Sequence, residues 1–448
     1  MTTFDQSLPL FINVVADVWG SDAITNNLFL RDPVGRLTLV VLDSGKTGVE
    51  REELSKAVDE VLGGYADPSG ISVATPEELF DESLREPGIG IAVPIDQATF
   101  QGHVRLVDRR VVGADWLRRP IEENSVIPRL FFVSLKGGVG RSTALCVLAA
   151  HLAASGRRVL AIDMDLEAPG LGTMLLDNTT LPQFGLLDYL VETNLGVVED
   201  LFLSDMLGFS QLSGGRGSIT VVPALGTRAN DSPLNVLSKL ARAYLPSEND
   251  PALNSFTAKI DKLIGRLTAA GDYDVVLVDA RAGLHESTAA AAVALQGNTL
   301  VFGMDQPQTY AGYRALLAQQ ALTLGPDWTT RIHIVEARVG ADGPSGEFIS
   351  NMIDILPNWY EIKKDSEIPL EDLHETFEIG WDVNTPAELI IDQEIDHTYI
   401  YESDLFNKFD PLEHPDLLSK GIYSAVYDEF LQACDAIIQS ADMIERRI

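Results

Sequence analysis

Cysteine, basic residues and long apolar runs are all scarce in this sequence of 448 residues. Its two cysteines, Cys146 and Cys434, are too few for a readable disulfide framework, which favours a reducing compartment. No window approaches the ~18 uninterrupted apolar residues that a membrane helix needs. Residues 1–13 lack a basic segment followed by a long apolar run, so we expect no secretory signal. The sequence therefore predicts a cytoplasmic protein without a transmembrane segment.

Positive charge is the second deficit, with 33 lysine and arginine residues against 66 aspartate and glutamate residues and a formal net charge of −33. This excess repels nucleic acid and anionic lipid at long range, so we expect neither as a general partner. The densest basic run comprises Arg105, Arg109, Arg110, Arg118 and Arg119. It could face phosphates or an acidic partner, but charge runs are usually solvated faces that balance local acid.

The length suggests two or three domains, at a prior of about 150 residues each. Residues 1–125 mix strand and helix patterns, which predicts an accessory α/β or α+β domain of unknown function. In residues 126–340, short apolar runs alternate with helical patterns, so we expect an α/β nucleotide-binding domain whose parallel sheet is flanked by helices. Residues 341–448 read as an acidic, mostly helical extension that packs on this domain or follows it.

The apolar periodicity also assigns individual elements, with a linker at 120–128. Strands are expected at 36–43, 71–73, 90–93, 103–107, 158–163, 218–223, 274–279, 299–303 and 331–335, and helices at 50–62, 144–154, 256–267, 286–295, 310–322, 348–356 and 421–448. The last helix carries more acid than base, whereas a membrane-surface helix is usually basic on its polar face. We therefore expect it to be a core or partner-facing helix.

A glycine-rich turn joins a short buried strand, which begins near Leu130, to the 144–154 helix. The turn reads Lys136-Gly137-Gly138-Val139-Gly140-Arg141-Ser142-Thr143. Backbone N–H groups and the positive helix end would converge there on an anion, so each of these eight residues is a candidate for binding phosphate. A standard P-loop reads G-x-x-x-x-G-K-[ST]. Here Leu135 stands at its first glycine and Arg141 at its lysine.

Carboxylates end two other strands of the same predicted sheet. Asp163 and Asp165 close one strand, and Asp279 closes another. Because the carboxyl ends of parallel strands share one edge, all three should approach the glycine-rich turn. Mg²⁺ prefers oxygen ligands and retains several waters, so Ser142 would bind it together with phosphate oxygens while Asp279 holds a metal-bound water. Asp163 or Asp165 would orient the attacking water or the hydration shell of the metal, so each is a catalytic candidate.

Three segments together resemble the deviant Walker A box, switch I and switch II of the ParA/MinD group of P-loop ATPases. They are the turn at 136–143, the D-x-D turn of Asp163 and Asp165, and the apolar run that ends in Asp279-Ala280-Arg281-Ala282-Gly283. The resemblance covers roughly residues 128–340. It implies ATP and Mg²⁺ as ligands, slow ATP hydrolysis, and an ATP-dependent homodimer that signals to or positions an unidentified protein partner. The front lysine of the family reaches the nucleotide of the second subunit, a catalytic role that would fall to Lys136.

Two arginines depart from the family pattern. Arg141 is a planar fork where lysine offers a point charge, so nucleotide binding would survive while turnover slows. Arg281 is either an extra phosphate clamp, and so a nucleotide-binding residue, or an ion-pair partner of switch I. The segment 336–338, after the last predicted strand, lies where relatives place a base-reading turn; residues 305–307 could border the base instead.

Three functional interpretations follow. The first is a slow ATPase whose nucleotide-bound dimer signals to a partner. The second is a nucleotide-sensing regulatory module with little or no hydrolysis, for example within a bacterial regulatory or defence system. The third, a scaffold with a structural anion site, is disfavoured because carboxylates beside phosphate are costly without Mg²⁺.

Overall fold

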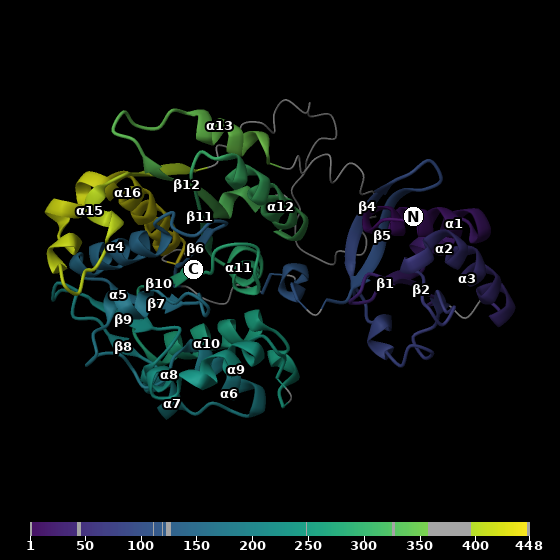
Figure 1. Cartoon of the computed structure of the whole chain (residues 1–448), viewed down its shortest axis with the longest axis horizontal. Helices are drawn as coiled ribbons and strands as arrows, with labels where there is room; N and C mark the ends of the chain where they lie inside the picture. The colour runs from purple at the N-terminus through teal and green to yellow at the C-terminus, as the bar shows by residue number, and fades with distance from the viewer. Residues whose placement is uncertain are drawn as a thin grey trace. The chain divides into compact units, whose positions relative to one another are not determined.

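The computed structural model of this chain describes residues 2–42, 46–110, 112–118, 120–121, 127–247, 249–324, 328–356 and 396–445. These residues fall into two compact units, which divide between Ala114 and Asp115. The N-terminal unit contains the described residues up to 114, and the C-terminal unit contains those from 115 onward. Figure 1 labels the helices and strands of both units.

The N-terminal unit is a mixed five-stranded sheet with helices packed on it. Its strands are β1 (Leu28–Arg31), β2 (Leu37–Val40), β3 (Val73–Ala74), β4 (Ile91–Asp96) and β5 (Gln101–Asp108), in the order β3-β2-β1-β5-β4. Its helices are α1 (Phe4–Trp19), α2 (Asp22–Thr25) and α3 (Gly48–Leu62). Strand β1 runs antiparallel to β2 and parallel to β5. Phe11 and Val15 of α1 are fully buried in one core with Leu54 and Val58 of α3.

The C-terminal unit is built on an eight-stranded sheet that is parallel except at one edge. Its strands are β6 (Arg129–Ser134), β7 (Arg158–Asp163), β8 (Gly208–Phe209), β9 (Ser218–Val222), β10 (Val275–Asp279), β11 (Asn298–Gly303), β12 (Ile332–Val339) and β13 (His397–Tyr401). The order is β13-β12-β11-β6-β10-β7-β9-β8, and only β8 runs antiparallel to its neighbour. Strand β10 is fully buried, as expected for a parallel strand covered on both faces.

Helices cover both faces of this sheet. The helices of this unit are α4 (Arg141–Ala154), α5 (Leu171–Leu175), α6 (Leu186–Leu195), α7 (Asp200–Ser204), α8 (Thr227–Asp231), α9 (Pro233–Ala243), α10 (Phe256–Ala270), α11 (Glu286–Ala289), α12 (Pro307–Leu324), α13 (Glu347–Asp354), α15 (Asp404–Asn407) and α16 (Lys420–Glu445). Helices α4 and α16 lie side by side on one face (Figure 1). There the Phe430 ring of α16 packs against Phe132 and Phe302 of the sheet. The apolar face of α16 is thus buried in the core.

Most of the predicted elements are present, although α1, β1 and β13 were not predicted, and one predicted strand needs correction. We expected the last strand to end at residue 335 and 336–338 to form a turn, but β12 continues to Val339. It continues because it is paired on both sides: Glu336 lies opposite Gly303 of β11, and Ala337 lies opposite Ile400 of β13. Most of the predicted linker and of the acidic 361–404 stretch lies outside the described residues. Among the helices that are described, none combines the length and apolar character needed to cross a bilayer.

Candidate functional site

The glycine-rich loop connects the end of β6 to the start of α4. Gly138 and Gly140 have φ angles of 78° and 88°, which glycine adopts at little cost, and Gly140 is the N-cap of α4. The Val139 side chain is buried and anchors the loop, whereas Lys136 is exposed. The loop therefore presents its backbone and one lysine at the amino end of a helix, the arrangement that binds anions.

Strand order brings the predicted carboxylates to this loop. Strand β10 lies between β6 and β7, so their carboxyl ends are adjacent. In the register, Asp279 pairs with Asp163 of β7 on one side and with Phe132 of β6 on the other. Asp165 follows two residues after Asp163. The structure thus gathers at one sheet edge the residues that the sequence placed on three separate strands.

Arg141 and Ser142, at the start of α4, both contact Asp279. The Ser142 hydroxyl donates to Asp279 Oδ2 at 2.5 Å, and Arg141 Nε forms an ion pair with Asp279 Oδ1. Arg141 also reaches Asp165 Oδ2 and Ser134 Oγ, each at 3.4 Å. Its side chain is 7% exposed. The guanidinium therefore faces carboxylates of its own chain.

Charge and burial act in opposite directions on these groups. Burial raises the pKa of Asp279, although the neighbouring Arg141 charge and the Ser142 hydrogen bond lower it. Burial lowers the pKa of Arg141, but the charges of Asp279 and Asp165 outweigh this effect and raise it. Arg141 is therefore a permanent cation against buried acids.

Asp163 organises the loop that follows β7. Its carboxylate is fully buried and accepts backbone N–H groups of Asp165 at 3.1 Å and of Gly170 and Leu171 at 3.0 Å each. Burial and the Asp279 charge raise the pKa of Asp163 to about 7, although these hydrogen bonds lower it. In this conformation Asp163 fixes the backbone of the loop, while Asp165 faces Arg141.

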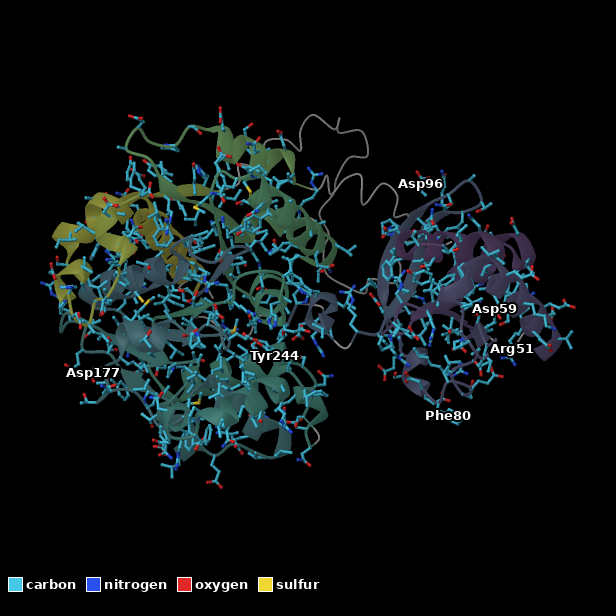
Figure 2. All side chains as sticks on the ribbon, in the orientation of Figure 1. Arg51, Asp59, Phe80, Asp96, Asp177 and Tyr244 are labelled. Atoms are coloured by element: carbon cyan, nitrogen blue, oxygen red, sulfur yellow. The ribbon has the colours of Figure 1, made fainter. Side chains whose placement is uncertain are left out.

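Arg281 forms an ion pair with the loop after β7. Its Nη1 lies 3.0 Å from Glu167 Oε1, in the loop after β7. The Tyr244 hydroxyl donates to the same oxygen at 2.9 Å, and His285 Nε2 is 3.8 Å away. Tyr244 lies just beyond the end of α9 (Figure 2). Sequence reasoning missed Glu167 and Tyr244; Glu167 shares a turn with Asp163 and could have been singled out.

Lys136 and Thr143 complete the predicted set. Lys136 Nζ donates to Gln306 Oε1 at 2.9 Å, so the 305–307 segment borders the glycine-rich loop. Thr143 is partly buried in the first turn of α4. The structure therefore brings Lys136, Arg141, Ser142 and the three aspartates to one edge, with Arg281 attached to it through Glu167.

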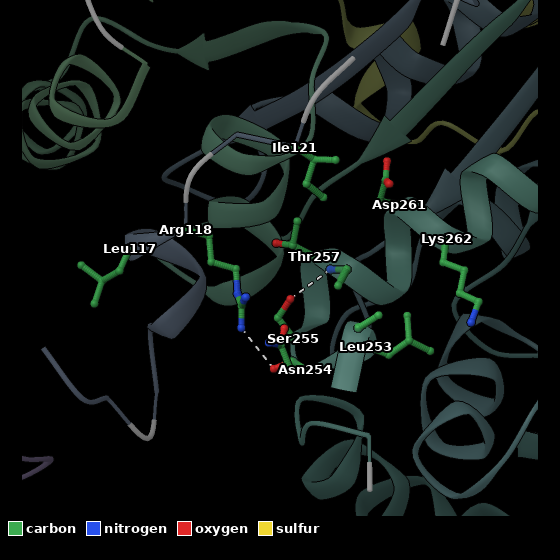
Figure 3. Close-up of a pocket in the computed structure, with 11 residues that line it drawn as sticks. Leu117, Arg118, Ile121, Leu253, Asn254, Ser255, Thr257, Asp261 and Lys262 are labelled. Carbon is green, nitrogen blue, oxygen red and sulfur yellow. Dashed lines mark hydrogen bonds between the residues drawn. The ribbon is translucent and has the colours of Figure 1, made fainter. Parts of the chain in front are cut away.

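Three arginines of the basic run pair with nearby acids. Arg109 pairs with Asp81 and Arg110 with Asp108 in the N-terminal unit. Arg118 lines a cleft of about 770 Å³ beside the start of α10, where it pairs with Asp115 at 2.8 Å and donates to Asn254 O at 3.1 Å (Figure 3). These contacts agree with the interpretation that the basic run neutralises nearby acidic side chains. Arg119 lies outside the described residues.

A family comparison agrees with this geometry. Residues 130–433 match the family model of the CobQ/CobB/MinD/ParA nucleotide binding domain. Similar solved structures include a ParA family ATPase from Chlorobium tepidum (20% identity, TM-score 0.39, 66% of this chain and 97% of that one) and the MinD cell division protein of Aquifex aeolicus (17%, 0.38, 71% and 96%). An ATP complex of a Cyanothece McdA variant is also similar (14%, 0.39, 68% and 97%). No curated protein sequence matches the chain.

Proposed function

Because the chain belongs to the family of CobQ/CobB/MinD/ParA nucleotide binding domains, we propose that it is a Mg-ATP-dependent switch with slow ATP hydrolysis. The observation that supports this most directly is the meeting of Asp163, Asp165 and Asp279 with the glycine-rich loop on adjacent strands. A phosphate loop alone would bind an anion; the carboxylates add a place for a metal and an attacking water.

The phosphates of ATP would bind to residues 136–143. The backbone N–H groups and the amino end of α4 supply fixed partial positive charge, and Lys136 supplies a full charge at the open side of the loop. Arg281 contributes indirectly in this arrangement, since its charge is shared with Glu167. A base pocket beside Gln306 fits the position of the 305–307 segment, which touches the loop through Lys136.

Ser142 and Asp279 fit a magnesium ion. Asp279 Oδ1 is buried and accepts no hydrogen bond from the described residues, although Arg141 lies beside it. Within the described part of the chain, no group of three or more His, Cys, Asp or Glu side chains forms an all-protein metal cage. That matches Mg²⁺, which takes a few protein oxygens and completes its shell with phosphate and water. Bound Mg²⁺ would neutralise charge on the phosphate oxygens.

To hydrolyse ATP, the chain has to position the attacking water and stabilise the negative charge on the phosphate oxygens. We assign orientation of the attacking water to Asp165. Asp163 is fully buried and accepts three backbone N–H groups, whereas Asp165 accepts one, from Ala168, and its other oxygen contacts the Arg141 side chain. Asp163 would then hold the loop in place for Asp165. Arg141 must leave part of its contact with Asp165 and Asp279 to approach a phosphate, which predicts slow turnover.

The ATP-bound form would be a homodimer that signals to or positions a protein partner. Lys136 is suited to reach a second subunit because it is exposed beside the loop. The scarcity of cysteine and of positive charge supports a cytoplasmic protein partner over nucleic acid or membrane. The ion pairs of Arg141 favour a second candidate, a nucleotide sensor with little hydrolysis.

Two measurements on the full chain separate these candidates. Equilibrium titration with a fluorescent ATP analogue and Mg²⁺ should show saturable binding, and release of inorganic phosphate should exceed background at high protein concentration. Nucleotide binding without phosphate release would support the nucleotide sensor and exclude the ATPase. Absence of nucleotide binding would exclude both candidate functions.

Ser142→Ala and Asp279→Ala provide the matched tests of the metal site. In both variants, nucleotide binding should no longer depend on Mg²⁺. The control is Ser155→Ala, which removes a hydroxyl at the opposite end of α4 and should keep this dependence. Normal Mg²⁺-dependent turnover in Asp279→Ala would show that this aspartate holds no metal-bound water.

A further inference from the structure

A hollow of about 450 Å³ lies at one edge of the N-terminal sheet, where β1 and β5 both end. Arg31, the last residue of β1, lines it together with the turn at 32–35, Phe4 of α1 and the residues that follow β5. Nothing in the nucleotide site requires this hollow. It belongs to the N-terminal unit, whose role the sequence left open.

Arg31 is a buried cation with one nitrogen, Nε, that has no hydrogen-bond partner in the described part of the chain. The residue is 9% exposed, and its Cζ lies 4.2 Å from the centre of the Phe4 ring. Among the described residues, no side chain accepts a hydrogen bond from this Nε. Burial lowers the pKa of Arg31, and the charge of Asp108 opposes that shift. Buried arginines are ordinarily paired, because an unpaired buried charge is strongly destabilising.

The acids around the hollow are engaged by other donors. Asp32 Oδ1 accepts the backbone N–H groups of Val34 at 3.0 Å and Arg36 at 2.8 Å. Asp108 Oδ2 lies 2.9 Å from Arg110 Nε and 2.7 Å from Arg110 Nη2. Both carboxylates are therefore used within the unit. Arg109 and Arg110, which also line the hollow, pair with Asp81 and Asp108, so Arg31 is the lining arginine most available to a ligand.

We propose that this hollow binds a small organic anion whose phosphate or carboxylate contacts Arg31. A guanidinium fork matches the paired oxygens of either group. The Phe4 ring and the exposed side chains of Val34 and Val112 offer apolar surface around the charge, which suits an anion carried on an aromatic or aliphatic body. The volume is within the range of small-molecule sites, about 300–1,000 Å³.

Calorimetric titration of the full chain tests the proposal with three probes: phenyl phosphate, benzoate and uncharged benzyl alcohol. At least one anion should bind, and Arg31→Met should weaken it by about 10- to 100-fold, the range for a hydrogen-bonded charge. The matched control is Arg36→Met, in the same turn but exposed, which should change affinity by less than about twofold. Tighter binding of phenyl phosphate than of benzoate would identify a phosphate ligand, and the reverse order a carboxylate.

The glycine-rich loop could also bind phenyl phosphate, but Arg31→Met leaves that contribution unchanged, so the difference between wild type and variant isolates this hollow. Failure of nucleotide binding would not affect the result. If Arg31→Met does not fold, Arg31→Lys keeps the charge without the fork and should lose about 3- to 10-fold. Equal binding by wild type and Arg31→Met, equal binding of benzyl alcohol, or no binding of either anion would overturn the proposal.

Discussion

Arg141 faces inward, toward the group that is proposed to hold magnesium. Its Nε forms an ion pair with Asp279 and its Nη2 lies 3.4 Å from Asp165 Oδ2. A divalent cation near Asp279 therefore meets a positive charge that is already in place. Since arginine is not deprotonated in proteins, the competition can be relieved only by movement of the guanidinium.

Replacing Arg141 by lysine should relieve this competition. A lysine ammonium is a single point charge and cannot contact Asp279, Asp165 and Ser134 at once. We expect Arg141→Lys to release phosphate about 3- to 10-fold faster and to need less Mg²⁺ for half-maximal rate, as for the loss of one or two hydrogen bonds. Steady-state phosphate release against Mg²⁺ concentration measures both quantities.

The control for this exchange is Arg129→Lys. Arg129 begins β6, at the end of the strand opposite to the glycine-rich loop, and pairs with Asp261 at 3.2 Å. The phosphate-release rate and the Mg²⁺ requirement of Arg129→Lys should equal those of wild type. A slower Arg141→Lys enzyme with an increased Mg²⁺ requirement would show that the arginine assists the metal site.

Sequence reasoning reaches some of these residues and not others for a physical reason. The glycine-rich turn and the strand-end acids Asp163 and Asp279 are local features, so their spacing predicts where they meet. The direction of the Arg141 side chain depends on distant acids, and the partner of Glu167 lies 77 residues away in Tyr244. Contacts of that kind have no local pattern. The binding and catalytic roles of all these residues stay predictions.

At the scale of elements, Glu167 joins the loop after β7, the loop after β10 and the end of α9. Burial lowers the pKa of His285 and so disfavours the imidazolium form, although the Glu167 charge opposes this shift. Arg281 thus forms the ion pair with Glu167, and the Tyr244 hydroxyl donates a hydrogen bond to it. Removal of the hydroxyl should loosen both loops together.

We expect Tyr244→Phe to speed amide hydrogen exchange about 3- to 10-fold in residues 163–170, as for the loss of one hydrogen bond. Hydrogen-exchange mass spectrometry of the nucleotide-free chain measures this. Tyr423→Phe is the matched control, because its hydroxyl contacts His151 at the last turn of α4, at 3.3 Å. A change restricted to the residues around position 244 would show that Glu167 does not couple the elements.

Lys259, in α10, makes a pH-dependent contribution to the free energy of unfolding. Its side chain is fully buried, and Nζ donates to Asn194 Oδ1 and to Leu245 O. Burial lowers its pKa to about 8 from 10.5, although the Asp115 charge raises it. Between these values the unfolded chain binds more protons than the folded chain, so stability rises as pH rises from about 8 to 10.5.

Lys259→Met should therefore remove part of the increase in unfolding free energy between about pH 8 and pH 10. We expect a difference from wild type of order 1–3 kcal/mol, measured by urea unfolding at both pH values. Lys262→Met serves as the control, since Lys262 is an exposed residue of the same helix and pairs with Asp250. A wild-type slope equal to that of Lys259→Met would mean that Lys259 stays charged in the folded protein.

Periodicity predicts most elements because each buried face repeats locally. The strands of the parallel sheet are examples, and the predicted fold class is confirmed. Helix α1 was missed although Leu8, Phe11, Ile12 and Val15 have helical spacing, because Pro9 within it reads as a breaker. Strand β13 was missed because its place depends on pairing with β12, far away in sequence.

On the scale of the whole molecule, one chain combines a nucleotide-binding unit with a separate N-terminal unit. The resemblance to ParA/MinD ATPases is confirmed by the family match over residues 130–433. We recognise no motif in the sequence of the N-terminal unit. The feature that distinguishes it, the buried Arg31 whose Nε has no hydrogen-bond partner among the described residues, comes from three-dimensional burial. Sequence patterns could not have shown it, since β1 was not predicted.

The proposed dimer can be tested at Lys136. In the described part of the chain its side chain makes a single hydrogen bond, to Gln306, so Lys136→Ala should fold normally. We expect wild type to dimerise with Mg²⁺ and a slowly hydrolysed ATP analogue, and Lys136→Ala to raise the dimer dissociation constant at least about 10-fold, as for a lost charge–phosphate contact. Analytical ultracentrifugation over a range of protein concentrations measures this constant.

Lys56→Ala controls for the loss of a surface charge. Lys56 is 70% exposed on α3 and pairs with Glu52 one helical turn away, so its removal should leave the dissociation constant unchanged. Nucleotide binding by Lys136→Ala, measured at a concentration where the wild type is monomeric, distinguishes a role across the interface from one within the subunit. Retained binding with lost dimerisation places the lysine across the interface. Equal loss of both would assign Lys136 to the nucleotide of its own chain, and an unchanged dimer would exclude it from the interface.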